Sequence, residues 1–94
     1  MINNSPVIVK RRPGHSEDYD ERKLYASIYA SCLAVRTPVG SSEITADKVC
    51  QDIQKWLAEK PEITSADIRR KASEHLAVYH PDAAYMYKHH RLML

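Results

Sequence analysis

Glycine is scarce in this chain, since Gly14 and Gly40 are the only two glycines among its 94 residues. Loops that cradle phosphate groups with backbone amides need several glycines at fixed spacing, because only glycine lets the backbone approach the ligand closely enough. The chain contains neither a Gly-x-x-x-x-Gly-Lys-Ser/Thr pattern nor a Gly-x-Gly-x-x-Gly pattern. A conventional phosphate-cradling loop is therefore excluded.

Cysteine is equally rare, and neither Cys32 nor Cys50 has a second cysteine at the spacing of a metal site. Both occupy positions of an apolar helical period, which predicts two buried free thiols. The five histidines include no pair at a familiar zinc spacing. His89 and His90 are neighbours in a predicted helix, so they cannot share one of its faces. The sequence predicts no metal site.

Long apolar runs and blocks of a single charge are also missing. No stretch approaches the roughly 20 apolar residues of a membrane span, and residues 1–5 lack the apolar core of a signal peptide. The 14 basic and 12 acidic side chains are interspersed and leave a net charge of +2. With 44% apolar residues, this composition indicates one soluble domain over residues 1–94, with residues 1–5 as a flexible N-terminus. We expect a cytoplasmic protein.

The N-terminal segment has the pattern of a β-hairpin. Residues 6–11 are rich in β-branched side chains, and Pro13 and Gly14 suit the two central positions of a type II turn. Residues 15–19 would return as the second strand. Regular alternation would send Lys10 and Arg12 to one face of the sheet, with Glu17 brought back alongside them.

Helical periodicity begins at Asp20, which we expect to be the N-cap of the first helix. A loop over residues 37–42 would end that helix, and a second helix would run from about Ser42 until Lys60 and Pro61 break it. Residues 62–64 are predicted as a further short strand, Thr64 or Ser65 as the cap of a third helix, and residues 82–91 as a fourth helix.

The predicted buried positions follow the helical period. The first predicted helix contributes two rows, one of Leu24, Ile28 and Cys32 and one of Tyr25, Tyr29 and Leu33. The second contributes Ala46, Val49, Cys50, Ile53, Trp56 and Leu57. The third contributes Ile68, Ala72, Leu76 and Tyr79, and the fourth contributes Ala83, Met86 and His90. Short connections favour antiparallel neighbours. The predicted fold class is mainly α (α+β): a four-helix bundle capped by a small N-terminal β-hairpin or three-stranded sheet.

Cations and carboxylates gather in residues 10–23. Arginine offers a fork of donors to phosphate oxygens and lysine a mobile point charge, so this group suits a polyphosphate. Carboxylates in the same place can accept hydrogen bonds from an adenine amino group or a ribose hydroxyl. The alternative interpretation is a solvated edge strand that its charges protect from pairing with other chains.

This stretch resembles the N-terminal signature of the ATP-cone, an allosteric domain known mainly from ribonucleotide reductases and their transcriptional repressor. The signature Val-x-Lys-Arg-x-Gly-x-x-Glu-x-Phe-Asp-x-x-Lys aligns without gaps from Val9 to Lys23. Weaker likeness continues through residues 24–28, 64–68, 84–85 and 91. Arg11 stands where the family has lysine, which leaves a slipped register through Lys10 and Arg11 open, and Pro13 is unusual.

The resemblance implies a binding site for ATP or dATP, with Mg²⁺ as a companion of the triphosphate, and no catalytic residues, so the chain is not expected to be an enzyme. The implied ligand-contacting residues are Val9, Lys10, Arg11, Arg12, Glu17, Asp20, Lys23, Ser65, Arg69 and Arg91. The carboxylates among them would lie near adenine and the cations of the first strand along the nucleotide.

The resemblance further implies that nucleotide choice controls how subunits associate. The expected partners are a ribonucleotide reductase subunit, a transcriptional regulator or further copies of the chain. The chain is too short for the reductase barrel and lacks the four-cysteine zinc ribbon of the repressor, so we expect a stand-alone cone. Two alternatives remain open. One is a helical protein-interaction module that has lost its ligand; the other is a nucleic-acid-binding domain that uses residues 10–12 and the basic fourth helix.

Overall fold

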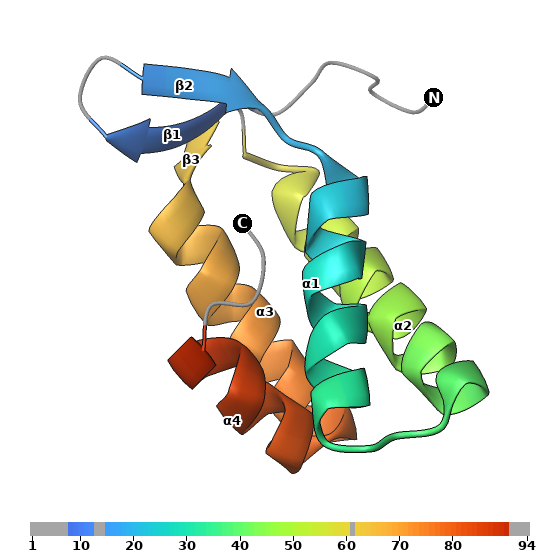
Figure 1. The fold of residues 1–94 in the computed structure, drawn as a ribbon. Coiled ribbons are helices and arrows are strands. Elements are labelled where there is room, and N and C mark those ends of the chain that lie inside the picture. The colour runs from blue at the N-terminus through green and yellow to red at the C-terminus, as the bar shows by residue number, and fades with distance from the viewer. Residues whose placement is uncertain (1–7, 13–14, 61, 91–94) are drawn as a thin grey trace.

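The computed structural model describes residues 8–12, 15–60 and 62–90, and the side chains of 18–60 and 62–89. The elements in chain order are β1 (Ile8–Arg12), β2 (His15–Asp18), α1 (Glu21–Ala34), α2 (Val39–Leu57), β3 (Glu62–Thr64), α3 (Ser65–Tyr79) and α4 (Pro81–His90). Figure 1 shows the helices packed side by side, with the strands across one end of them next to the starts of α1 and α3. The mainly helical fold class is confirmed.

The sheet has the order β2-β1-β3, with β1 in the centre. β1 pairs antiparallel with β2, where Val9 faces Glu17, and parallel with β3, where Lys10 faces Thr64. The predicted turn at Pro13 and Gly14 lies outside the described residues. Between Lys10 and Arg12 the β1–β2 register shifts, so two steps along β1 match one step along β2. An irregularity of this kind interrupts the period of two, and the side chains of these two cations lie outside the described part of the chain, so their alternation stays a prediction.

The core lies between the four helices and consists of small and aliphatic side chains from each of them. The predicted rows of α1 through Leu24, α2 through Ile53 and α3 through Leu76 are mostly buried. Trp56 of the α2 row and the second α1 row at Tyr25 and Tyr29 are only partly buried. The predictions for Leu33 and Tyr79 are wrong, since these side chains are 39% and 40% exposed. Both lie in the last turn of a helix, where the neighbouring helices no longer cover them.

Helix α4 presents a different face to the core from the one its sequence pattern predicted. Ala83 is buried as expected, but Ala84 and Tyr87 complete the buried face and Met86 is only half-buried. The reason is that α4 packs against both α1 and α3, so its covered stripe is broad and displaced by one residue. The side chain of His90, the third predicted position, lies outside the described part of the chain.

The helix ends follow their capping chemistry. Asp20 accepts a hydrogen bond from the backbone N–H of Arg22 at 3.0 Å and is the N-cap of α1, as predicted. Thr64, rather than Ser65, caps α3 by accepting from the N–H of Asp67 at 3.0 Å. Pro81 opens α4 one residue earlier than predicted, in the first helical position that proline favours.

The loop between α1 and α2 is shorter than predicted. Helix α2 begins at Val39 rather than near Ser42, because Pro38 holds an extended conformation and its carbonyl accepts the first helical bond from the Ser42 N–H at 2.9 Å. Glycine and serine in this segment suggested a loop, but they form the first turn of the helix. No helix in residues 8–12, 15–60 and 62–90 is long and apolar enough to cross a membrane.

Candidate functional site

The predicted site residues of the N-terminal segment lie on the two hairpin strands. Val9, Lys10, Arg11 and Arg12 belong to the central strand β1, and Glu17 of β2 is paired with Val9. On its other side β1 runs parallel to β3. The last residue of β3, Thr64, is the N-cap of α3, so the helix follows the strand directly. The sheet register therefore brings the basic strand beside the N-terminus of α3.

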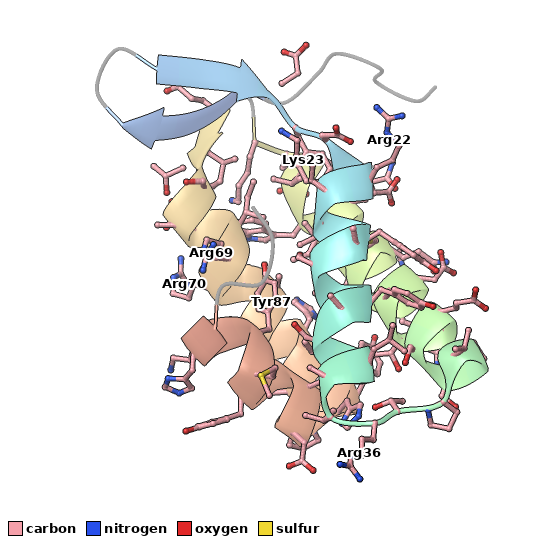
Figure 2. The ribbon with its side chains drawn as sticks, in the orientation of Figure 1. Arg22, Lys23, Arg36, Arg69, Arg70 and Tyr87 are labelled. Atoms are coloured by element: carbon pink, nitrogen blue, oxygen red, sulfur yellow. The ribbon has the colours of Figure 1, made fainter. Side chains whose placement is uncertain are left out.

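The start of α1 contributes Asp20 and Lys23. Asp20 accepts from the backbone N–H and, at 3.5 Å, from the side chain of Arg22, and the backbone hydrogen bond is the main reason that the pKa of this carboxyl is lowered. Figure 2 shows Lys23 on the side of α1 that faces the sheet and α3, whereas Arg22 points away from them. The side chains of Arg22 and Lys23, although adjacent in α1, therefore lie on different sides of the helix.

The start of α3 contributes Ser65 and Arg69, both half-buried. The next residue, Arg70, is exposed and forms ion pairs with Asp67 at 3.2 Å and with Glu74 at 3.5 Å. Arg69 makes no ion pair with any side chain that the structure describes, although it lies close enough to Tyr87 for its charge to lower the pKa of that phenol. Arg69 is therefore the cation of α3 that lies near Tyr87 of α4 (Figure 2).

Two tyrosine hydroxyls lie at the same end of the bundle. Both Tyr19, which precedes α1, and Tyr87 of α4 carry a buried hydroxyl that has no hydrogen-bond partner within the described residues. Burial is the main cause that raises the pKa of Tyr87 to about 12, and it also raises the pKa of Tyr19. Both phenols stay protonated at neutral pH, so each presents a neutral group that can donate and accept.

The sequence patterns missed Tyr19 and Tyr87 as site residues. The ring of Tyr87 is part of the core. Burial of the hydroxyl depends on how α4 packs against α1 and α3, which a helical period does not specify. The position of Tyr19 directly before Asp20 is the one signal in the sequence that could have drawn attention to it.

The two cysteines are free and buried, as predicted. Burial raises the pKa of Cys32 and, with smaller effects of Glu21 and Asp47, raises the pKa of Cys50 to about 12. Neither sulfur is a thiolate at neutral pH, and a thiol is a poor nucleophile. Among the described residues there is no group of three or more His, Cys, Asp or Glu side chains that could hold a metal ion.

The described candidate residues belong to four different segments. Lys23 belongs to α1, Ser65 and Arg69 to α3, and Tyr87 to α4, while β1 supplies Lys10 at the register position next to Thr64. We call this region the sheet end. Arg91, the remaining predicted site residue, lies outside the described part of the chain. The arrangement offers cations, helix N-termini and neutral hydroxyls, which are groups that bind an anion bearing further polar atoms.

Comparison with protein families gives the class of this small helical bundle. The family model of the ATP cone domain matches residues 7–91, nearly the whole chain, so the chain belongs to the ATP cone domain family. It is accordingly a nucleotide-binding regulatory module of the kind that takes ATP or dATP as an allosteric effector. No curated protein and no solved structure matches the chain significantly.

Proposed function

We propose that this domain binds ATP or dATP at its sheet end and thereby controls a partner enzyme or regulator, or its own oligomerisation. The observation that supports the proposal best is that Lys23 and Arg69 lie near the starts of two helices that begin next to the sheet, while Tyr19 and Tyr87 carry buried hydroxyls that lack partners among the described residues. Buried polar groups are almost always satisfied in native proteins, so an unsatisfied pair is explained by a polar ligand.

Each part of the site suits a different part of the nucleotide. The cations Lys23 and Arg69, with Arg11 and Arg12 of β1, would hold the phosphates, and the N-terminus of α3 at Ser65 adds the positive end of its helix dipole. Glu17 and Asp20 would accept hydrogen bonds from the adenine amino group. Mg²⁺ would enter with the triphosphate and share its oxygens, which is how this ion is usually held.

Regulation would follow from the way the ligand joins elements that are distant in the sequence. A nucleotide at the sheet end would contact β1, the start of α1 and the start of α3 together, and would favour the conformation in which all three approach it. A ligand shifts an equilibrium only by its difference in affinity for the two states. The expected partners are a ribonucleotide reductase subunit, a transcriptional regulator or a second copy of the chain.

The first test is calorimetric titration of the folded protein with ATP, dATP and GTP, each with and without Mg²⁺. We expect binding of the adenine nucleotides and weaker binding of GTP. Lys23→Ala should weaken binding, whereas Arg36→Ala, a change of a cation on the α1–α2 loop away from the sheet, should leave it unchanged. Absence of adenine-nucleotide binding by a folded sample would contradict the proposal and favour a protein-interaction module without a ligand.

The regulatory half of the proposal needs a separate measurement. Size-exclusion chromatography with light scattering, run without nucleotide and with saturating ATP or dATP, reports the mass of any assembly. We expect at least one nucleotide to change the mass of the protein alone or of its mixture with a candidate partner. Tight binding with no change in either mass would leave the site intact but contradict control of assembly.

A further inference from the structure

Three lysines lie over aromatic rings along the line where α2 packs against α3. The ammonium group of Lys48 in α2 is 5.6 Å from the centre of the Tyr79 ring in α3. The ammonium groups of Lys60, which follows α2, and Lys71 of α3 are 5.3 and 5.8 Å from the centre of the Trp56 ring. We call these five residues the lysine–aromatic face. None of them belongs to the sheet end.

Two lysines of this face keep their hydrogen-bonding capacity, although a carboxylate lies among them. Asp52 accepts a hydrogen bond from the Tyr79 hydroxyl and contacts His75 at 3.2 Å, so its charge is engaged between α2 and α3. Lys48 and Lys60 form no ion pair with any side chain that the structure describes. A ring attracts an ammonium group by its electrons but leaves N–H donors for another acceptor. Both lysines can therefore bind carboxylates from outside the chain.

Contact with a ring also prepares these lysines for binding. A free lysine side chain loses much rotamer freedom when a ligand immobilises it, and this loss weakens binding. The rings restrict Lys48 and Lys60 before any ligand arrives. Trp56 packs against the core, so the ring beneath Lys60 is itself held in place. The face therefore presents positive charges at defined positions.

Two features favour an acidic protein segment over a nucleic acid as the ligand of this face. Single-stranded nucleic acids stack their bases on aromatic rings, but lysines already lie over the Trp56 ring. Carboxylates also interrupt the positive charge, since Asp52 lies beside Tyr79 and Glu74 pairs with Lys71 at 3.6 Å. These would repel a continuous row of phosphates. A protein segment can place its carboxylates opposite the lysines alone.

We infer that the lysine–aromatic face binds an acidic segment of a partner protein, whose carboxylates pair with Lys48 and Lys60. The inference rests on the proposed function, in which the domain controls a partner, and adds the surface and the chemistry of that partner. Lys60 stands two residues before β3, and Lys71 belongs to α3, which follows β3 directly. A nucleotide that shifts these elements would change the spacing of the ammonium groups.

The test begins with a phage-displayed library of random dodecapeptides, selected on the immobilised full chain at about 0.15 M salt to limit unspecific attraction. We expect enrichment of aspartate and glutamate. The most enriched peptide, labelled with fluorescein, is then titrated with wild type and variants by fluorescence anisotropy. Lys48→Gln combined with Lys60→Gln should lower its affinity at least about fivefold, because two exposed charge pairs are lost.

The matched control is Arg36→Gln combined with Lys88→Gln. It removes the same charge from exposed positions on the α1–α2 loop and on α4, so the peptide should bind as tightly as to the wild type. Circular dichroism checks that both double variants keep the helical content of the wild type. Equal losses in both would indicate a general electrostatic attraction and would overturn the inference. Enrichment of peptides without acidic residues, or an affinity that neither double variant lowers, would overturn it as well.

The remaining outcomes separate this inference from its alternatives. A fluorescein-labelled oligothymidylate that binds more tightly than the peptide, and loses affinity with Lys48 and Lys60, would overturn the acidic partner in favour of a nucleic acid. Folded protein that binds ATP but selects no acidic peptide would overturn the inference and leave nucleotide binding standing. Acidic peptides that bind through Lys48 and Lys60, to protein that binds no adenine nucleotide, would support the surface and contradict nucleotide control.

Discussion

The two ends of this helical bundle differ in whether their polar side chains are hydrogen-bonded within the chain. At the end away from the sheet, the Thr37 hydroxyl and the His80 ring nitrogen Nε2 lie 2.7 Å apart and join the α1–α2 loop to the α3–α4 junction. The Ser42 hydroxyl donates to the Thr37 carbonyl at 3.3 Å in the same place. At the sheet end, by contrast, the hydroxyls of Tyr19 and Tyr87 are buried and have no partner among the described residues.

This contrast distinguishes a structural region from a binding region. The hydrogen bonds of the loop end join two connections of the chain to each other, so they stabilise the bundle. Even the buried serines of α1 are paired internally, since the Ser31 hydroxyl donates to the Ser27 carbonyl at 2.9 Å. At the sheet end, the two tyrosine hydroxyls have no partner among the described residues, and the half-buried Arg69 forms no ion pair with a described side chain. We therefore expect changes at the sheet end to alter binding and changes at the loop end to alter stability.

The largest effect should come from Arg69→Ala. A charge-assisted hydrogen bond to phosphate contributes about 1.5–3 kcal/mol, so the affinity for ATP should fall about ten- to a hundredfold in calorimetric titrations. Arg70→Ala is the matched control: this neighbour is exposed and paired with Asp67 and Glu74, so its removal should leave the affinity unchanged. Equal losses in both variants would show only a general electrostatic attraction.

Thr64→Ala should affect both stability and binding, because Thr64 caps α3 and also faces Lys10 in the sheet. Loss of an N-cap costs about 1 kcal/mol, which chemical denaturation would measure. The hydrogen bond from the Thr64 side chain is the main reason that the pKa of Asp67 is lowered. A carboxyl whose pKa is lower in the folded protein than in the unfolded chain stabilises the fold at pH values above its unfolded-state pKa. This stabilisation is lost as the pH falls through the folded-state pKa. The deficit of the variant should therefore shrink below about pH 4.

Thr37→Val tests the loop end by removing the partner of His80 while keeping the shape of the side chain. We expect the free energy of unfolding to fall by about 0.5–1.5 kcal/mol, the usual contribution of one hydrogen bond. The affinity for ATP, measured well below the unfolding temperature, should match that of the wild type. A change in affinity comparable to that of Arg69→Ala would contradict the division between the two ends.

Tyr79→Phe should have the smallest effect. Its exposed hydroxyl donates to Asp52 at 2.5 Å, and His75 contacts the same carboxylate at 3.2 Å, so this cluster links α3 to α2. The hydrogen bond to Asp52 is the main cause of the raised pKa of Tyr79. A phenol whose pKa is higher in the folded protein than in the unfolded chain stabilises the fold at pH values below its unfolded-state pKa, about 10. This stabilisation is lost as the pH rises through the folded-state pKa. Urea unfolding should show a loss of at most about 1 kcal/mol at pH 7 that disappears in strong alkali.

The sequence predicted well what periodicity and capping determine. The apolar rows through Leu24, Ile53 and Leu76 are buried, and Asp20 caps α1, because local spacing decides which face a helix covers. The start of α2 was missed because Gly40 and its serine neighbours are typical of loops, whereas the chain geometry at Pro38 begins the helix before them.

Features set by contacts between distant segments were harder to predict. The core face of α4 depends on its simultaneous contacts with α1 and α3, and the register shift in β1 depends on its pairing with β2. Arg36 adopts a φ of 64°, a conformation that favours glycine, and nothing in the local sequence indicates it. The buried hydroxyls of Tyr19 and Tyr87 are likewise a product of tertiary packing, which the spacing of tyrosines along the chain does not specify.

The most direct test of nucleotide binding at the sheet end is a two-dimensional amide NMR titration of the folded protein with ATP. The account predicts saturable shifts at Lys23, Thr64, Arg69 and Tyr87, and unchanged signals at Thr37 and His80. Shifts centred on the α1–α2 loop, or no saturable shift at the starts of α1 and α3, would contradict it.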